Sequence, residues 1–387
     1  MIKLRRCILP WSVIMFEHTT AASGHRHKLF STLAWLWLLY TISLGHTVLA
    51  GDGLLLQPTE AAENWKLPRN AIDSTQIPEF TLDANASKHQ PLPVYRLRNN
   101  SYFLYGTIDT LNEKNRGWNG NAGFIVTDAG VLVIDSLGTP MLGHRLIATI
   151  RSITEQPIKY LVITHNHPDH AYGAGPFRDI AGIKIIAHQG TLDYNHSATL
   201  QNSVDYRREI LPADMRGFKP VQADVYIGPP VFGHKQISLG NSHFDIYNTG
   251  SHHSYGDLVV HQREQNILWI SDLAFNQRLT YMGDGNSAQI LRAQDWLMQT
   301  FPDVELMVPG HGSAQTPPFP MVRKTHDYVT RMRKTMRQAV ADGTSLYDAV
   351  QQVEFDDWKQ TRLYQQNQKA NANFVYREME QAFFEDF

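Results

Sequence analysis

The sequence predicts a chain of the mixed α/β class, and the order of its expected elements is the main observation behind this prediction. A strand–helix–strand unit covers residues 124–163, a run of strands follows over residues 225–270, and the pattern after residue 321 is helical. This order suits two mixed β-sheets packed face to face with helices outside, an αββα sandwich, because each sheet must bury one face. The apolar content of 42% is ample for the core of such a domain.

Short apolar runs bounded by turn residues predict the strands. Asp128-Ala129-Gly130, for example, is a strong turn signal between two such runs. The strands are expected at residues 102–105, 124–126, 131–134, 161–163, 183–187, 225–227, 236–239, 244–247, 258–261, 267–270 and 304–308.

Apolar residues at helical spacing predict a helix over residues 141–153, with Thr139 as its candidate N-cap. A further helix is expected to begin at a cap on Ser287 and to end at residue 300. From residue 321 onwards the pattern is mostly helical and breaks once, at Gly343-Thr344.

The most informative stretch is residues 161–170, in which an apolar run leads into three histidines and a carboxylate within six residues. Neutral imidazole and carboxylate are ligands that suit zinc and its neighbours. Six residues are too few to place all four side chains around one tetrahedral ion without strain, but they can serve two ions. We therefore expect His165 and His167 to point to one ion and Asp169 and His170 to the other.

Composition restricts the kind of metal site and the partners. The single cysteine, Cys7, lies near the N-terminus, so a metal site downstream must be built from histidine and carboxylate. Without residues 1–50 the chain has 30 basic and 36 acidic residues, a net charge of −6, and no basic stripe is visible. This charge argues against nucleic acid as a partner. The expected partner is a small-molecule substrate.

The first 50 residues look like a targeting segment. An apolar run over residues 29–44 is short for a membrane span, and Val48-Leu49-Ala50 has the small-residue pattern of a signal-peptide cleavage site. We expect a periplasmic or secreted chain with no stable membrane span once mature; an uncleaved anchor is the alternative. The expected organisation is a signal peptide (1–50), a loosely ordered leader (51–93), the main domain (94–316) and a C-terminal helical extension (317–387).

The histidine-rich stretch resembles the His-x-His-x-Asp-His motif of the metallo-β-lactamase superfamily. Three later elements extend the resemblance over residues 95–315: His253 before Ser254-Tyr255-Gly256-Asp257, Asp272 at the end of an apolar strand, and His311 in Pro309-Gly310-His311-Gly312. His252 is the competing choice at the first of these. Asp135 matches an early aspartate of the family that orients the metal loop rather than binding metal.

The resemblance implies the αββα sandwich and two Zn²⁺ ions, with Fe or Mn as other occupants. It places His165, His167 and His253 on one ion. It places Asp169, His170 and His311 on the other, with Asp272 between them. Two ions that share a water lower its pKa to about 7, and the resulting hydroxide attacks an ester, thioester, lactam or related centre. As the catalytic residue, Asp169 would orient this hydroxide or carry its proton. Asp272 favours the glyoxalase-II-like majority over the true β-lactamases.

A closer resemblance comes from residues 120–126 and 271–278, together with the expected export. These stretches look like the periplasmic quinoprotein-relay (SoxH-like) zinc metallohydrolases. In that reading Asn276 and Arg278 could reach an anionic group of the substrate.

Two other functions stay open. His165, His253 and Asp272 alone could form a mononuclear iron site, as in persulfide dioxygenases of this fold. Alternatively, the chain could be a non-catalytic, metal-binding accessory protein of a periplasmic quinoprotein. The sequence does not determine the oligomeric state.

Overall fold

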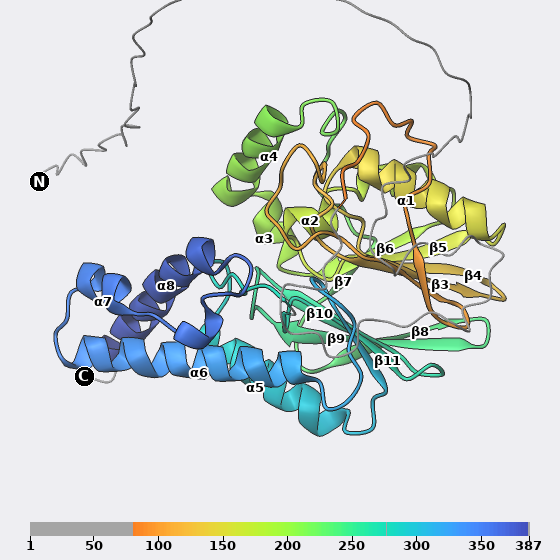
Figure 1. Ribbon diagram of the computed structural model, residues 1–387. Coiled ribbons are helices and arrows are strands. Elements are labelled where there is room, and N and C mark those ends of the chain that lie inside the picture. The colour runs from red at the N-terminus through yellow and green to blue at the C-terminus, as the bar shows by residue number, and fades with distance from the viewer. Residues whose placement is uncertain (1–79, 276, 386–387) are drawn as a thin grey trace, which may run out of the picture. The chain divides into compact units, whose positions relative to one another are not determined.

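The computed structural model describes residues 80–275 and 277–385 (Figure 1). The expected signal peptide, most of the expected leader, and Asn276 lie outside the described residues. Within them, two mixed β-sheets are flanked by helices, which confirms the predicted fold class.

The first sheet has seven strands in sequence order. The first four strands pair antiparallel, whereas β4 to β7 run parallel, so their carboxyl ends meet at one edge of the sheet. Such an edge is where open α/β sheets bind ligands. The strands are β1 (Tyr95–Arg98), β2 (Ser101–Leu104), β3 (Ala122–Thr127), β4 (Gly130–Ile134), β5 (Ile158–Val162), β6 (Lys184–His188) and β7 (Val225–Ile227).

The second sheet has five strands in the order β12-β11-β10-β9-β8. All neighbours pair antiparallel except β11 and β12, which run parallel and are joined through helix α5 (Ser287–Thr300). The strands are β8 (His234–Leu239), β9 (Ser242–Gly250), β10 (Asp257–Gln262), β11 (Ile267–Ser271) and β12 (Leu306–Pro309).

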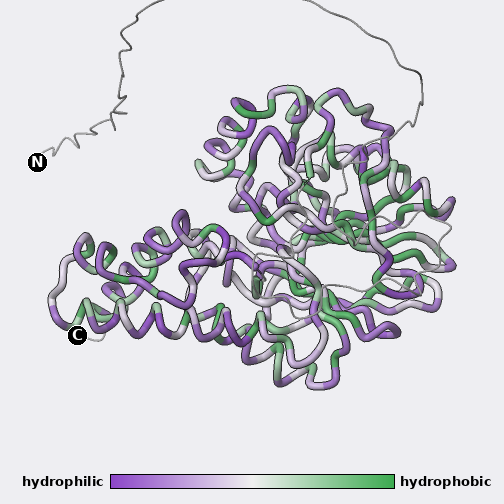
Figure 2. Tube along the Cα trace, viewed as in Figure 1, coloured by the Kyte–Doolittle hydropathy of each residue, from purple (hydrophilic) through white to green (hydrophobic). Residues whose placement is uncertain are grey.

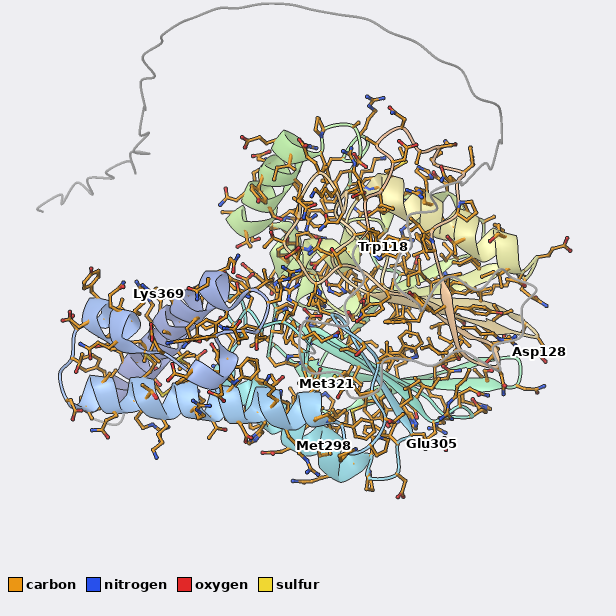
Figure 3. All side chains as sticks on the ribbon, in the orientation of Figure 1. Trp118, Asp128, Met298, Glu305, Met321 and Lys369 are labelled. Atoms are coloured by element: carbon orange, nitrogen blue, oxygen red, sulfur yellow. The ribbon has the colours of Figure 1, made fainter. Side chains whose placement is uncertain are left out.

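One hydrophobic core lies between the sheets, where buried side chains of the first sheet such as Phe103, Leu132 and Val162 share a cluster with Phe244 and Trp269 of the second. Figure 2 shows hydrophobic residues concentrated along these strands, and Figure 3 shows side chains filling the layers. The central strands, such as β4 and β11, are buried at every position, which agrees with the short apolar runs that predicted them.

Helices cover the outer face of each sheet. On the first sheet, Leu142, Leu146 and Ile150 of α1 pack against the strands. On the second sheet, α5 and the start of α6 do the same. The helices on the first sheet are α1 (Pro140–Ile153), α2 (Pro168–Ala171), α3 (Thr191–Asn195) and α4 (Ala198–Ile210), with a short 3₁₀ turn, η3 (Gly175–Asp179).

The C-terminal part consists of α6 (Pro320–Ala341), α7 (Leu346–Gln352), the 3₁₀ turn η4 (Asp356–Trp358) and α8 (Tyr364–Glu385). These elements share a separate hydrophobic core around Tyr328, Met332 and Val375. None of the helices in the described part of the chain is long and apolar enough to cross a membrane.

The structure corrects three predictions of local structure. Strand β1 was not predicted, because its short Tyr-Arg-Leu-Arg run offers only one buried position. The N-cap of α5 is Asn286 rather than Ser287, because the Asn286 side chain accepts the amide proton of Gln289. The C-terminal helices break twice, at residues 342–345 as predicted and again over residues 353–363, where η4 lies.

Residues 80–92 pack against the first sheet. Leu92 is buried in its outer core, the ring of Phe80 lies 4.7 Å from that of Trp118, and Arg145 donates a hydrogen bond to the backbone oxygen of Gln90. The described end of the expected leader is therefore attached to the sandwich.

Candidate metal centre

The predicted donors come from loops at one edge of the two sheets. The loop after β5 carries His165 and His167, and α2 begins there, so that Asp169 and His170 lie in its only turn. The second sheet supplies His253 from the β9–β10 loop, Asp272 directly after β11, and His311 directly after β12. A backbone hydrogen bond from Leu258 to the oxygen of Thr164 joins the first loop to the second sheet.

His165, His167, His253 and Asp272 form one cluster, in which one donor atom from each lies within 4.8 Å of the others. Nδ1 of His167 lies 2.8 Å from Nε2 of His253, which lies 3.0 Å from Oδ2 of Asp272. Nε2 of His165 lies 3.9 Å from the same carboxylate oxygen.

Asp169, His170 and His311 form the second cluster. Nε2 of His311 lies 3.5 Å from Oδ2 of Asp169 and 3.4 Å from Nε2 of His170. Asp272 also contacts this cluster, because its Oδ1 lies 3.4 Å from His170 and its Oδ2 lies 3.2 Å from His311. The Asp272 carboxylate therefore lies between the two groups, and all seven predicted donors converge.

Unpartnered atoms test whether these residues fit a metal. Among the described residues, Nε2 of His165 and Oδ1 of Asp272 are buried without a hydrogen-bond partner. Leaving such atoms unpaired is expensive in free energy, and a bound cation would satisfy both. A donor set of imidazole and carboxylate suits Zn²⁺ and also Fe or Mn. The residues thus fit divalent metal ions.

Asp135 contacts two residues of the histidine-rich stretch, Thr164 and His170. Its Oδ2 lies 2.9 Å from Nδ1 of His170, and its two carboxylate oxygens accept hydrogen bonds from the amide and hydroxyl of Thr164. Burial raises the pKa of Asp135, whereas the contact with His170 lowers it. Its φ of 60° is strained for a residue with a side chain, so the surrounding contacts must hold it in place. Asp135 can therefore fix the ring of His170.

Three further contacts to the donors were missed by sequence reasoning. Oδ2 of Asp284 lies 3.1 Å from Nε2 of His167. The Asn119 side chain donates to Oδ2 of Asp169 at 2.8 Å, and its backbone oxygen lies 2.8 Å from Nδ1 of His311. These residues have no metal-ligand spacing. The only available signals were the Asp284-Gly285 turn ahead of a helix and the position of Asn119 in a predicted loop.

The charges of the centre favour cations. Burial lowers the pKa of His170, but the neighbouring carboxylates, with Asp272 first, outweigh burial and raise this pKa to about 9. Burial raises the pKa of Asp272, yet the surrounding histidines, with His311 first, hold it well below its usual value. His170 must therefore release a proton when it binds a metal, so metal binding is coupled to pH.

Of two adjacent histidines, only His253 enters a donor cluster. The Asp257 carboxylate accepts the amide protons of His252, His253 and Ser254, which folds the loop tightly. His252 instead contacts the Thr249 hydroxyl, at 3.2 Å from Nε2, and burial lowers its pKa to about 4.

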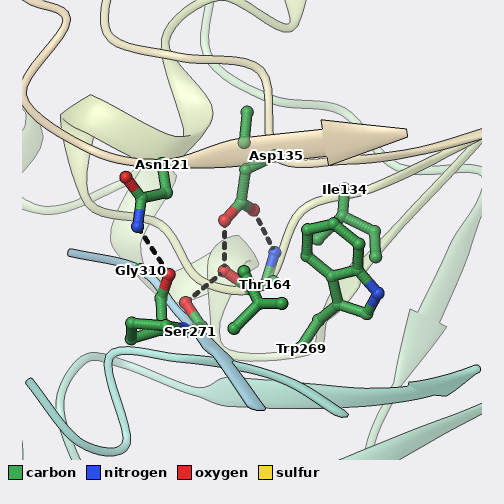
Figure 4. Close-up of a pocket in the computed structure, with 10 residues that line it drawn as sticks. Asn121, Ile134, Asp135, Thr164, Trp269, Ser271 and Gly310 are labelled. Atoms are coloured by element: carbon green, nitrogen blue, oxygen red, sulfur yellow. Dashed lines mark hydrogen bonds between the residues drawn. The ribbon is translucent and has the colours of Figure 1, made fainter. Parts of the chain in front are cut away.

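A small pocket lies where residues of the two sheets meet, and Thr164, Ser271 and Gly310, which line it, each precede a donor in the sequence (Figure 4). Thr164 is hydrogen-bonded to Asp135 and to Ser271, and the Asn121 side chain donates to the backbone oxygens of Pro309 and Gly312. A Cβ on Gly310 would lie 1.9 Å from Oδ1 of Asp272. Only glycine allows the chain to pass this close to the carboxylate.

Comparisons with known proteins identify the family of the chain. A family model for the metallo-beta-lactamase superfamily matches residues 115–311, slightly more than half of the chain. The chain is 26% identical over 194 residues to the probable metallo-hydrolase YqgX of Bacillus subtilis (strain 168), a match that covers 50% of this chain and 84% of that protein.

The chain also matches two solved structures at low sequence identity. The stereoselective inverting sec-alkylsulfatase Pisa1 from Pseudomonas sp. has a TM-score of 0.59 at 15% identity, over 74% of this chain and 50% of that chain. The metallo-beta-lactamase from Pontibacter korlensis has a TM-score of 0.47 at 18% identity, over 61% of this chain and 98% of that chain.

Two histidine–aspartate clusters at one edge of paired mixed sheets define a metal-dependent enzyme. Because the family match spans both clusters, the chain belongs to the metallo-beta-lactamase superfamily and is a metal-dependent hydrolase. The family predicted from the sequence is thereby confirmed.

Proposed function

We propose that this chain is an exported di-zinc hydrolase that acts on a small-molecule ester, thioester, lactam or related centre. The observation that carries the proposal is the position of Asp272 between two donor clusters, each with three further donors of its own. A carboxylate in that position can hold two cations and offset their mutual repulsion. Export rests on the targeting pattern of residues 1–50.

The chain's own residues have separable tasks in such a reaction. Divalent ions bound at this centre would polarise the scissile group and lower the pKa of a water to about 7. Asp169 belongs to the second cluster. The side chain of Asn119 donates a 2.8 Å hydrogen bond to its Oδ2. Burial raises the pKa of Asp169, but His170 and His311 outweigh burial and lower this pKa, so the group stays ionised and can bind a cation or accept a hydrogen bond from a water.

The donor count supports hydrolysis over the mononuclear iron alternative. A persulfide-dioxygenase-like site needs only His165, His253 and Asp272, whereas the second cluster adds three buried donors. Because buried polar groups are expensive without a partner, three such donors are better explained by a second ion. The quinoprotein-relay resemblance supports a periplasmic location and leaves the substrate open.

Elemental analysis of the purified mature chain, combined with a chromogenic substrate panel, tests the proposal. The panel contains an ester, a thioester, a β-lactam, a phosphodiester and an alkyl sulfate, the last because of the similarity to Pisa1. Two zinc ions per chain and turnover of one class that stops with a chelator would support a di-zinc hydrolase. One iron per chain would favour a dioxygenase. Two zinc ions without any turnover would favour the accessory protein.

A further inference from the structure

Arg278 lies beside the second donor cluster. Its Nη1 is 3.1 Å from Nδ1 of His311, and its guanidinium carbon lies 5.8 Å from the ring centre of Phe275. The Phe275 ring in turn stacks on His311, with centroids 5.7 Å apart. Burial lowers the pKa of Arg278, although a guanidinium remains charged at any physiological pH.

The charge of Arg278 has no local counter-ion. Among the described residues, no aspartate or glutamate oxygen lies within 4.0 Å of this guanidinium, and its buried Nε has no hydrogen-bond partner. The adjacent Arg362, by contrast, lies 3.5 Å from Oδ1 of Asp109.

His311 cannot serve as a hydrogen-bond partner of Arg278 when a metal is bound. With Nε2 facing the donor cluster, the ring proton lies on Nδ1 and is directed to the backbone oxygen of Asn119, 2.8 Å away. Nδ1 then has no lone pair for the Arg278 donor. The guanidinium is thus left with unused donors next to the reacting centre.

The C-terminal extension holds Arg278 in this position. Its backbone forms a parallel bridge with that of Arg362, and the amide of Leu279 donates to the Arg362 oxygen at 2.8 Å. The side chain of Asn367 in α8 donates to the Leu279 oxygen at 3.0 Å. A cation fixed in this way is preorganised for a ligand.

We propose that Arg278 binds an anionic group of the substrate, a carboxylate, sulfate or phosphate, beside the cluster of Asp169, His170 and His311. This inference rests on the proposed hydrolase function and adds that the substrate is an anion. The planar fork of a guanidinium matches an oxyanion with two parallel hydrogen bonds. An anion would also offset the repulsion between this cation and metal ions bound nearby.

Matched substrates and variants test the inference. One arm compares mono-4-nitrophenyl glutarate, which carries a remote carboxylate, with its neutral methyl ester. A second arm uses 4-nitrophenyl sulfate and 4-nitrophenyl phosphate, in which the anion is itself the reacting group. Arg278→Gln removes the charge and Arg278→Lys restores it without the fork. Arg331→Gln, which breaks an exposed pair with Asp357, is the control.

We expect Arg278→Gln to lower kcat/KM for the preferred anionic substrate by about 10- to 100-fold, the usual effect of losing a hydrogen-bonded charge pair. Turnover of the neutral ester should change less than about 2-fold, Arg278→Lys should recover part of the loss, and zinc content should stay unchanged. Equal losses on charged and neutral esters, or no loss on either, would overturn the inference.

Binding separates failure of this inference from failure of the proposed reaction. If no substrate is turned over, glutarate, sulfate and inorganic phosphate are titrated calorimetrically into wild type and Arg278→Gln, with and without two equivalents of zinc. A Kd weakened about 10-fold in the variant for one anion supports the subsite even in a protein that lacks hydrolase activity. Equal Kd values in both proteins, or no binding to either, refute it.

Discussion

Nε2 of His167 lies 3.1 Å from Oδ2 of Asp284, and this contact determines which ring nitrogen of His167 faces the other donors. Because the carboxylate accepts the proton on Nε2, the lone pair of Nδ1 points to the first cluster, 2.8 Å from His253. Burial raises the pKa of Asp284, but the hydrogen bond to His167 outweighs burial and lowers it, so the partner is anionic.

Asp284→Asn should therefore weaken binding at the first cluster. Partners of metal-bound histidines typically contribute about 10- to 100-fold to affinity, and we expect a loss in this range for one of the bound metals. Competition with a chromophoric chelator measures it. Asp295→Asn is a matched control, because Asp295 contacts His326 at the surface. Identical affinities in the two variants would contradict the assigned role of Asp284.

Asp169→Asn tests proton handling at the second cluster. The amide cannot accept a proton, so turnover of the preferred substrate should fall by about 100-fold or more. Loss of a negatively charged donor should also reduce zinc content, which elemental analysis would detect. Asp179→Asn, in the exposed part of η3, should leave both unchanged. Full activity together with full metal content would eliminate Asp169 as the catalytic group.

Gly310→Ala should damage the centre without replacing any donor residue. A Cβ at this position would lie 1.9 Å from Oδ1 of Asp272 and 3.0 Å from Cε1 of His170, so the carboxylate must move. We expect zinc affinity to fall by at least about 10-fold in chelator competition. Gly175→Ala adds the same methyl group where nothing lies within 4 Å. If both variants bind zinc as wild type does, the close approach of Gly310 to Asp272 does not affect metal binding.

His252 should make the stability of the metal-free chain depend on pH. Burial lowers its pKa to about 4, whereas an unfolded histidine has a pKa of about 6.5. Between these values the unfolded chain binds more protons. The free energy of unfolding should therefore fall as the pH drops from about 6.5 to about 4, and the full contribution is present above 6.5.

Replacing His252 with Asn should flatten this dependence by up to about 3 kcal/mol, which urea unfolding at pH 7.5, 6.5, 5.5 and 4.5 would measure. His326→Asn, at the surface, should follow wild type. A difference between His252→Asn and wild type that stays constant over this range would show that His252 does not titrate as proposed.

Asn371 of α8 supports the segment that carries Asp284. Its side chain accepts the amide proton of Met282 at 3.0 Å and donates to the oxygen of Thr280 at 2.8 Å. Asn371→Leu leaves both backbone groups unpaired in a buried position and should lower the free energy of unfolding by about 2–4 kcal/mol. The Asn373 side chain accepts a hydrogen bond from Arg377 at the surface of α8, and Asn373→Leu should lower the free energy of unfolding by less than about 1 kcal/mol. Equal unfolding curves for the two variants would argue against this role.

The sequence predicts the donor residues better than it predicts the residues that contact and position them. The donors end apolar strands or follow one another within a few residues, so motif spacing identified His165 to His170, and family resemblance placed Asp272 and His311. These seven side chains converge in the structure, and their role as metal ligands stays a prediction. Asn119 and Asp284 escaped notice because each meets its partner across a long stretch of chain, 50 and 117 residues away.

Local structure was predictable where the local signal decides it. Short apolar runs between turn residues predicted most strands, and Thr139 caps α1 as predicted. Asn286 and Ser287 are both good caps by residue type. The choice between them depends on Glu378 of α8, whose carboxylate binds the amide and hydroxyl of Ser287. A contact between residues so far apart in the chain cannot be predicted from a short stretch of sequence.

The two sheets share the donors, four from the first and three from the second. A growing chain therefore lacks the complete first cluster until Asp272 has been made and the complete second cluster until His311 has been made, and neither forms before the later half has docked on the earlier one. The histidine-rich loop alone could capture ions only weakly and with little selectivity. Metal is thus bound late in folding. A bound ion then links the earlier and later halves of the chain.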